Sequence, residues 1–333
     1  MAGIGFQLRK LLAKESFLGL AEAYGYAAII GSGPWILSIV SLAVIGFFLG
    51  IHHSPEEAAP FFTSITYALA LTLILTGPLQ LILARYASDQ VFEKKFKEVF
   101  SSFVTSIFLV ISVSFIIAVP IFIWQGMGGL IERLSAAYLM CILGCIWTAT
   151  TYLTALKNFK AVLYSFFIGY LSSFALSLGA SYYLGISYAM TGFVIGQTIL
   201  FLLMARAFCL EWGMPFQFNL DFLRYFKLHP ALVTCGLFYN LGLWVDKFIY
   251  WFLSPQNMQV GSIFYSCPLY DVAVYLSFIS IAPGMAVFLM KLETDFAEKM
   301  MQFTDCIFNH ATYEEMSRLN EEIKVSIREG IGL

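Results

Sequence analysis

Three polar side chains interrupt a long apolar stretch, 230–252, which is long enough for one helix to cross a bilayer. They are Asn240, Asp246 and Lys247, although a charge at the centre of a membrane span costs about 2.5–3.5 kcal/mol. One interpretation places the two charges near an end of the span, where they reach toward the headgroups. The other makes them a polar site that faces the interior of a helical bundle or a water-filled cavity.

A third charge, Asp271, lies near the start of the next apolar stretch, at a depth similar to that of Lys247. Neighbouring residues on a helix point about 100° apart, so Asp246 and Lys247 do not face each other. We expect Lys247 to pair with Asp271, with Asn240 one heptad earlier on the same helical face; the alternative is that Lys247 snorkels to water. Asp246, which shares its face with Tyr239, then remains to contact a cationic or hydroxylated substrate.

Other patterns for catalysis or ligand binding are absent from the sequence. It has no GxxxxGK[ST] nucleotide loop, no serine elbow and no CxxC pair, and its histidines are not spaced as metal ligands. The cysteines fall mostly in apolar stretches, where a thiol packs as a small hydrophobe. We therefore expect no metal, no cofactor and no enzymatic activity. The residues concerned are His52, His53, His229, His310, Cys141, Cys145, Cys209, Cys235, Cys267 and Cys306.

Membrane helices are the elements that must position these residues. The chain has 333 residues, of which 59% are hydrophobic and 12% charged, whereas soluble domains carry about 25% charged residues. The apolar residues form blocks long enough to span a bilayer, so the sequence predicts an all-α, polytopic membrane bundle. The eight expected spans are 23–49, 65–83, 99–123, 134–156, 161–184, 189–210, 230–252 and 266–290.

Basic residues indicate how these spans are oriented. Of the 19 lysines and arginines, all but Arg133 and Lys247 fall at the N-terminus, in every second loop or in the C-terminal segment. By the positive-inside rule, these parts of the chain face the cytoplasm. We therefore expect both termini to be cytoplasmic.

Proline and glycine interrupt four of the eight spans. The positions are Gly33, Pro34, Gly77, Pro78, Pro120, Pro283 and Gly284. Proline removes a backbone donor and clashes with the preceding turn, so we expect kinks or breaks, which favour a transporter-like bundle over a passive anchor. We predict that Gly33 and Pro34 lie close to Gly77 and Pro78, and that these positions and Pro283 form a gate or hinge.

Polar segments divide the chain into five parts. An amphipathic cytoplasmic helix (1–22) precedes a first bundle of six transmembrane helices (23–210). A cytoplasmic connector (211–229) leads to two helices (230–290), which we expect to begin a second bundle. A cytoplasmic helical segment (291–333) follows.

The segment 291–333 is expected to contain two amphipathic helices. Thr312 and Glu315 form a capping-box pattern before the second helix. Apolar residues recur every three or four positions, more than a solvated linker needs. We expect a helical hairpin that docks on a partner protein or packs on the membrane domain. The docking residues are Leu292, Phe296, Met300, Met316, Leu319 and Ile323.

Several longer motifs in this sequence resemble those of one transporter family. They are MAGIGFQLRKLL from residue 1, AYGYAAIIGSGPWILS from 23, TGPLQLILARYASDQVFEKKF from 76, YNLGLWVDKFIYWF from 239, LETDFAEKM from 292 and ATYEEM from 311. Together they extend over the whole chain. They resemble the PelG family, part of the multidrug/oligosaccharide-lipid/polysaccharide exporter superfamily.

The resemblance implies a subunit of the bacterial inner membrane that serves biofilm exopolysaccharide biosynthesis. Such a subunit helps to move a nascent amino-sugar polymer across the membrane, and the implied partners are PelD, PelE and the glycosyltransferase PelF. The resemblance also implies two bundles of six helices, and the sequence has eight spans of these twelve. We therefore expect it to be a C-terminally truncated fragment, whose parent protein carries the function of the family.

Two rival functions remain open. An ion-coupled exporter of small molecules would prefer a deep acidic pocket in the first bundle, where this sequence has almost no intramembrane charge. A membrane scaffold would anchor a glycosyltransferase without moving any polymer. Substitution of interior polar residues would separate conduit from scaffold, because only a conduit loses export while the complex still assembles.

Overall fold

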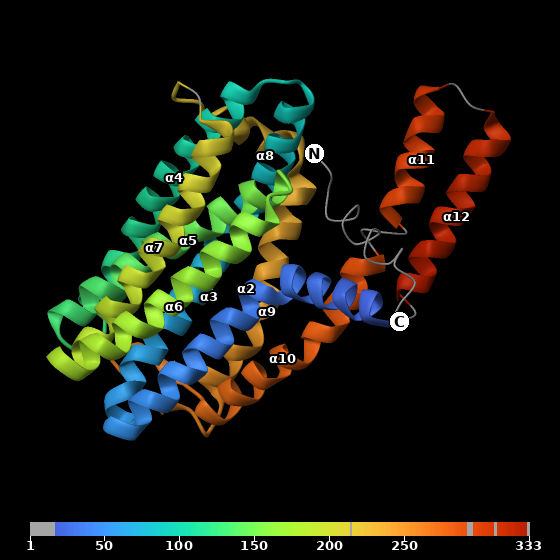
Figure 1. Ribbon diagram of the computed structural model, residues 1–333. Helices are drawn as coiled ribbons and strands as arrows, with labels where there is room; N and C mark the ends of the chain where they lie inside the picture. Colours follow the sequence, from blue (N-terminus) through green and yellow to red (C-terminus); the bar gives the residue numbers. More distant parts are fainter. Residues whose placement is uncertain (1–16, 214, 292–295, 310–311, 332–333) are drawn as a thin grey trace. The chain divides into compact units, whose positions relative to one another are not determined.

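A computed structural model describes residues 17–213, 215–291, 296–309 and 312–331 of the chain (Figure 1). It is 87% helical, and seven helices among these residues are long and apolar enough to cross a membrane. Each of the eight predicted spans coincides with a helix, so the prediction of an all-α polytopic bundle is confirmed. The long helices are α2 (Phe17–His52), α3 (Pro55–Phe92), α4 (Phe96–Ala118), α5 (Leu130–Ala155), α6 (Phe159–Leu184), α7 (Ala189–Trp212), α9 (Pro230–Leu253) and α10 (Pro268–Lys291).

Shorter elements join and follow these helices. A π-helical turn η1 (Val119–Trp124) extends α4, and a 3-10 turn η2 (Ile186–Tyr188) precedes α7. The connector contains η3 (Asp221–Leu223) and α8 (Arg224–Leu228), and a small antiparallel hairpin of β1 (Met258–Gln259) and β2 (Tyr265–Ser266) lies between α9 and α10. The C-terminal segment forms α11 (Ala297–Phe308) and α12 (Tyr313–Ile331).

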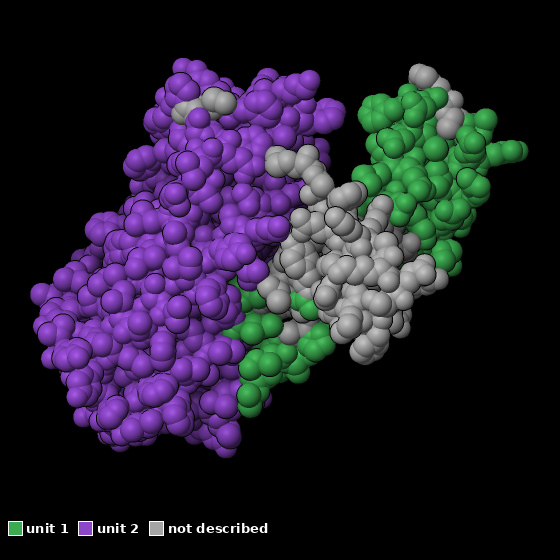
Figure 2. Space-filling view, in the orientation of Figure 1, with its two compact units in different colours: residues 1–36, 276–333 green, residues 37–275 purple. Residues whose placement is uncertain are grey.

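The chain divides into two compact units (Figure 2). One comprises residues 1–36 and 276–333, and the other comprises residues 37–275. The division falls inside α2 and inside α10. The predicted N-terminal helix, 1–22, lies mostly outside the described residues.

Helix α5 is central to the larger unit, where it packs against α3, α4 and α7. Helices α6 and α7 form the most extensive pair, because glycines of α7 let the two backbones approach closely. A Cβ added to Gly196 would lie 2.3 Å from the backbone nitrogen of Ser173. Hydroxyl groups then join the helices: Ser173 donates to the Phe193 carbonyl at 3.1 Å, and Ser177 donates to the Ala189 carbonyl at 3.0 Å.

Helices α3 and α9 touch backbone to backbone at one crossing point. A Cβ on Gly77 would lie 2.6 Å from the Gly236 carbonyl oxygen, and a Cβ on Gly236 would lie 2.2 Å from that of Gly77. One turn further along α9, the Asn240 amide donates to the Gly236 carbonyl at 3.0 Å. Only glycine fits at this contact, which fixes where the two helices cross.

The predicted kinks or breaks at proline take two forms in the structure. Helices α2, α3 and α10 run without interruption through Pro34, Pro78 and Pro283, so no break occurs at these three positions. Pro120 instead lies in the π-helical turn η1, where the regular α-helical hydrogen bonds have been lost. Among the prolines singled out in the sequence, Pro120 is thus the one at which the α-helix ends.

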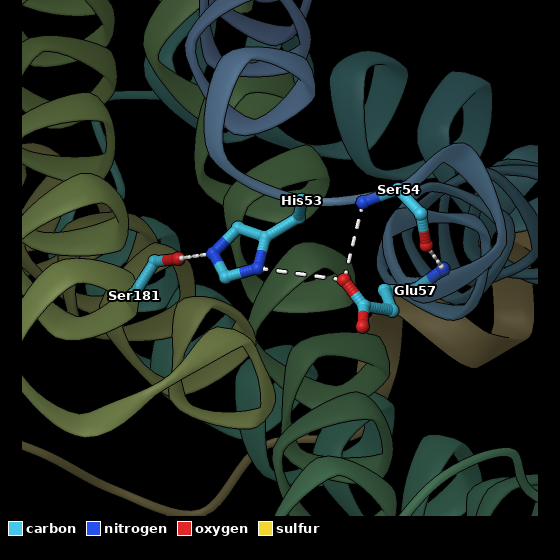
Figure 3. A network of polar contacts seen from close by, with 4 residues as sticks. All are labelled: His53, Ser54, Glu57 and Ser181. Atoms are coloured by element: carbon cyan, nitrogen blue, oxygen red, sulfur yellow. Dashed lines mark hydrogen bonds and ion pairs between the residues drawn. The ribbon is translucent and has the colours of Figure 1, made fainter.

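A small polar network joins the turn between α2 and α3 to the end of α6 (Figure 3). Ser54 and Glu57 form a capping box that starts α3. The Glu57 carboxylate lies 3.6 Å from Nδ1 of His53, whose Nε2 is 3.0 Å from the Ser181 hydroxyl. These contacts fix the end of α6 against the start of α3.

The connector is bound to the ends of α3 and α4. Its backbone N–H groups at Gln217 and Asn219 donate to the hydroxyls of Ser101 at 3.2 Å and Thr105 at 3.3 Å. The Asn219 side chain also donates to Glu98. Further along, the Tyr225 hydroxyl donates to the Asp89 carboxylate at 3.2 Å, and burial together with the Asp89 charge raises the pKa of Tyr225. These hydrogen bonds hold the connector against the first turns of α4 and the last turn of α3.

Helices α11 and α12 pack against each other, which confirms the predicted hairpin. The capping box that begins α12 is also confirmed, because Thr312 and Glu315 exchange backbone-to-side-chain hydrogen bonds of 3.4 Å. Of the predicted docking residues, Leu319 and Ile323 are buried and Phe296 and Met316 are half-buried. Met300 is exposed, and Leu292 lies outside the described residues.

Candidate functional site

One face of α9 carries the polar residues that the sequence singled out. The buried residues of this helix are Gly236, Asn240, Trp244, Lys247 and Trp251, a spacing of three or four that follows one helical face. Helix α9 packs on α3, so its polar face is turned toward protein. The Lys247 side chain is 1% exposed, which disfavours the interpretation that it snorkels to the headgroups.

Two aromatic rings lie near the Lys247 ammonium. Its Nζ lies 4.3 Å from the ring centroid of Trp244 and 5.9 Å from that of Tyr275. A cation over an aromatic face gains about 0.5–2 kcal/mol, more when it is desolvated. The Tyr275 hydroxyl is itself held at 3.2 Å from the hydroxyl of Thr66 on α3. This arrangement replaces part of the hydration that the ammonium loses on burial.

Asp271, at the start of α10, is fixed by donors. The indole N–H of Trp251 donates to its two carboxylate oxygens at 3.0 and 3.2 Å, and the backbone N–H of Cys267 donates at 3.3 Å. Both Asp271 and Asp246 interact electrostatically with Lys247. The three charges thus belong to one cluster, and direct pairing of Lys247 with Asp271 stays a prediction.

Asp246 is held differently from Asp271. Its Oδ2 accepts a hydrogen bond of 2.7 Å from the Tyr270 hydroxyl, and the Tyr270 ring stacks on Tyr250 at 3.7 Å. Its buried Oδ1 has no hydrogen-bond partner among the described residues. One buried carboxylate oxygen of Asp246 therefore has an unused acceptor position, and contact of Asp246 with a substrate stays a prediction.

A second aromatic layer ties this cluster to α3. Trp251 stacks on Tyr67 with centroids 4.6 Å apart, and the Tyr67 hydroxyl donates to the Tyr265 carbonyl at 3.0 Å. The hydroxyl also accepts from the Tyr265 backbone N–H at 3.2 Å. Tyr67 thus joins the β2 strand to α3 and closes one side of the site.

The structure brings together only some of the predicted site residues. Asn240, Asp246, Lys247 and Asp271 lie in or beside the cluster, whereas Tyr239, two turns before Asp246 on α9, is 64% exposed. Among the predicted gate residues, Gly33 and Pro34 belong to the smaller unit, as does Pro283, and Gly77 and Pro78 belong to the larger one. Within the part of the chain that the structure describes, no three His, Cys, Asp or Glu side chains form a metal-binding group.

The aromatic members of the site were missed in the sequence. Trp244 and Trp251 stand three residues before and four residues after Lys247, so their spacing alone places them on its helical face. Tyr67 and Tyr275 come from other helices, and no local pattern in the sequence marks them.

Comparisons with known proteins agree with this architecture. No curated protein matches the sequence. A MOP superfamily transporter from Pyrococcus furiosus has a similar structure, with a TM-score of 0.52 and 14% identity over 92% of this chain and 68% of that one. A MATE protein solved in complex with Br-NRF has a TM-score of 0.51 and 12% identity over 93% of this chain and 73% of that one.

The sequence itself matches a family model over residues 1–333. That family is described as "PelG: Putative exopolysaccharide Exporter (EPS-E)". The chain is thus a multi-pass membrane protein with the fold of MOP superfamily transporters, and it belongs to the PelG family.

Proposed function

We propose that this protein moves a nascent exopolysaccharide, a Pel-like amino-sugar polymer, across the bacterial inner membrane. Both termini of the chain would face the cytoplasm, where the basic residues gather. The protein would act as a subunit of a synthase complex with partners of the PelD, PelE and PelF type. Membership of the PelG family over the full sequence is the observation that carries this proposal.

The buried charges of α9 and α10 support a polar path for the polymer. Membrane proteins keep ionisable groups inside the bilayer mainly where these serve a substrate or ion path. Here Lys247 and Asp271 interact with each other and with aromatic neighbours, and Asp246 presents one carboxylate oxygen without a partner among the described residues. A carboxylate of this kind binds the hydroxyl or ammonium groups of a sugar chain well.

Export and complex assembly must be measured separately to test this function. In a strain that lacks the native gene, complementation with the wild-type gene should restore exported polymer, measured by hexosamine content outside the cell. Substitution of Asn240 and Asp246 together should reduce exported polymer while co-purification of the PelD-, PelE- and PelF-type partners stays unchanged. Normal export by this variant would contradict a conduit and would leave a scaffold as the better description.

A further inference from the structure

Two turns of the larger unit share both sequence and backbone conformation. Residues 94–103, KKFKEVFSSF, and 157–166, KNFKAVLYSF, are identical at six of ten positions. The first turn joins α3 to α4 and the second joins α5 to α6, so both lie at the same end of this antiparallel bundle. Half of the identical residues are explained by packing, because they are buried in both copies: Val99, Ser102, Phe103, Val162, Ser165 and Phe166.

The remaining identical positions form the pattern Lys-x-Phe-Lys, and packing does not explain its lysines. Lys94 and Lys157 are the only residues other than glycine with positive φ among the described residues, at 60° and 62°. A left-handed residue after a helix is usually glycine, since a side chain is disfavoured there. Both lysines are exposed. Two copies of the turn thus keep a lysine where the backbone favours glycine.

The second lysine of each copy is also in a locally unfavourable place. Lys97 and Lys160 lie in the first turns of α4 and α6, where the helix dipole favours negative charge. All four lysines are exposed, and none has an ion-pair partner within 4.0 Å among the described residues. Both copies thus place exposed positive charge at positions where a bound anion would compensate for it.

The second position of the pattern differs between the copies, Lys95 in one and Asn158 in the other. Unlike the four lysines, each of these two residues has a local partner. Lys95 forms an ion pair of 2.6 Å with Glu93. Its counterpart Asn158 accepts from the Ala161 backbone N–H at 3.2 Å and donates to Glu211 at 2.7 Å. The lysines that are the same in both turns are therefore exposed and have no local ion-pair partner among the described residues, whereas the position between them has a local partner.

We infer that the two Lys-x-Phe-Lys turns are binding sites for anionic phospholipid headgroups, one lipid at each turn. Turns that join membrane-spanning helices lie at the level of the headgroups, and the oxygens of one headgroup phosphate can accept from the ammonium groups of two lysines. Nearby aromatic side chains suit the same depth: Phe96 is 39% exposed and Phe92 is 84% exposed. The positive-inside rule requires basic residues in these loops, but it does not require them at left-handed positions.

The test uses the full chain in nanodiscs of phosphatidylcholine with added phosphatidylglycerol. Native mass spectrometry should find two retained phosphatidylglycerol molecules per wild-type chain. The variant Lys94→Gln/Lys97→Gln should retain one, and the variant that also carries Lys157→Gln/Lys160→Gln should retain none. Apparent affinity should fall about fivefold for each lysine that is removed.

A control with four charges removed at the same end of the bundle separates binding from diffuse attraction. Lys95→Gln/Arg206→Gln/Arg224→Gln/Lys227→Gln lowers the net charge by the same amount and should still retain two lipids. If this control loses as many retained lipids as the variant without the four turn lysines, the proposal is overturned. Displacement of the lipid by millimolar inorganic phosphate would overturn it as well, since it would show a site for small anions. Unchanged lipid retention in the variant without the four turn lysines, together with lost co-purification of partner proteins, would instead assign the turns to an acidic protein surface.

Glycine substitution tests whether the lysines serve the fold instead. Lys94→Gly/Lys157→Gly should raise the melting temperature in pure phosphatidylcholine, because it relieves the left-handed backbone, and should lose retained phosphatidylglycerol. A lower melting temperature would show that the lysines stabilise the helix ends, and this result would overturn the proposal.

Discussion

Asp271 is the residue whose loss should harm the protein most. Its carboxylate accepts from Trp251 and Cys267 and balances the buried Lys247 charge. We predict that Asp271→Ala lowers stability by about 3–5 kcal/mol, because the buried Lys247 loses one of its two counter-charges and Trp251 loses its acceptor. Fluorescence-detected size-exclusion chromatography after heating measures this effect.

The matched control exchanges the two charges, Lys247→Asp with Asp271→Lys, and should recover part of the lost stability if the two groups pair. If Asp271→Ala has the same protein level and stability as the wild type, the pairing is contradicted. No recovery in the exchanged variant would show that Asp271 acts mainly through Trp251.

Asp246 should affect export without affecting stability. Asn at this position still accepts the Tyr270 hydroxyl but removes the charge. We predict that Asp246→Asn keeps the normal protein level and lowers exported polymer about tenfold, the effect of losing one charge-assisted hydrogen bond to the substrate. Exported hexosamine, normalised to protein level in membranes, measures it.

Tyr270→Phe is the control for this prediction, since it removes the hydroxyl that Asp246 contacts and leaves the negative charge. Its export should stay close to that of the wild type. Equal loss of export in both variants would show that the hydrogen bond matters rather than the charge.

For single residues, the sequence predicts which charges lie within a membrane span but not which side chains surround them. Lys247 and Asp271 stand out because charge is rare in lipid. Trp251, which holds Asp271, is recognisable afterwards by its spacing from Lys247. Tyr67 comes from α3 and lies in the site only because α3 and α9 cross at glycines, and that crossing depends on tertiary packing.

At the scale of helices, the backbone contact between α3 and α9 can be tested directly by substitution of Gly236. A Cβ on Gly236 would lie 2.2 Å from a backbone oxygen that cannot move independently of its helix. We predict that Gly236→Ala costs about 1–3 kcal/mol, the usual effect of overpacking. The thermal midpoint of the purified protein in detergent measures it.

The same helix provides the control. Gly242 has nothing within 4 Å of an added Cβ, so Gly242→Ala should stabilise α9 by about 0.5–1 kcal/mol through helix propensity. A similar melting temperature for the two variants would contradict the backbone contact.

The glycine and proline pairs of α2 and α3 carry the prediction of a gate. Both helices are continuous at Pro34 and Pro78, so a gate would work by bending. We predict that Pro34→Ala/Pro78→Ala reduces export more than it reduces protein level, because alanine restores the missing backbone hydrogen bonds and stiffens both helices. Export equal to that of the wild type would reject the gate.

Helix positions could be predicted well from the sequence, since runs of apolar residues identify spans without any tertiary information. Whether a helix continues through a proline or ends at it could not be predicted from the sequence. Both Pro78 and Pro120 predict a kink or break from the sequence, yet α3 continues through Pro78 and a π-helical turn forms at Pro120. Pro78 lies beside the tight α3–α9 contact, whereas Pro120 is close to the end of its helix.

For the whole molecule, the C-terminal hairpin carries the prediction of partner docking. Leu319 and Ile323 are already buried, and the exposed apolar residues of α11 and α12 include Met300, Ile307 and Phe308. We predict that deletion of 293–328 lowers co-purification of the synthase partners at least about tenfold, because these residues supply the contact. Unchanged recovery of the partners in a pull-down from membranes would contradict docking.

Three substitutions on α11 provide the matched variant for this deletion. Met300→Gln/Ile307→Gln/Phe308→Gln changes exposed side chains only, so the hairpin should keep its fold while partner recovery falls. Loss of partners on deletion with full recovery in this variant would assign the contact to another face of the hairpin.

The anchored connector has a consequence for the order in which the protein enters the membrane. Ser101 and Thr105 precede Gln217 and Asn219 by 116 and 114 residues, so a ribosome makes them roughly 6–23 s earlier. The acceptors on α4 are therefore already in the bilayer when the connector emerges. Its backbone can attach to them at once, and α9 then begins its insertion beside α3, next to the glycine it must contact, instead of searching for its neighbour after synthesis.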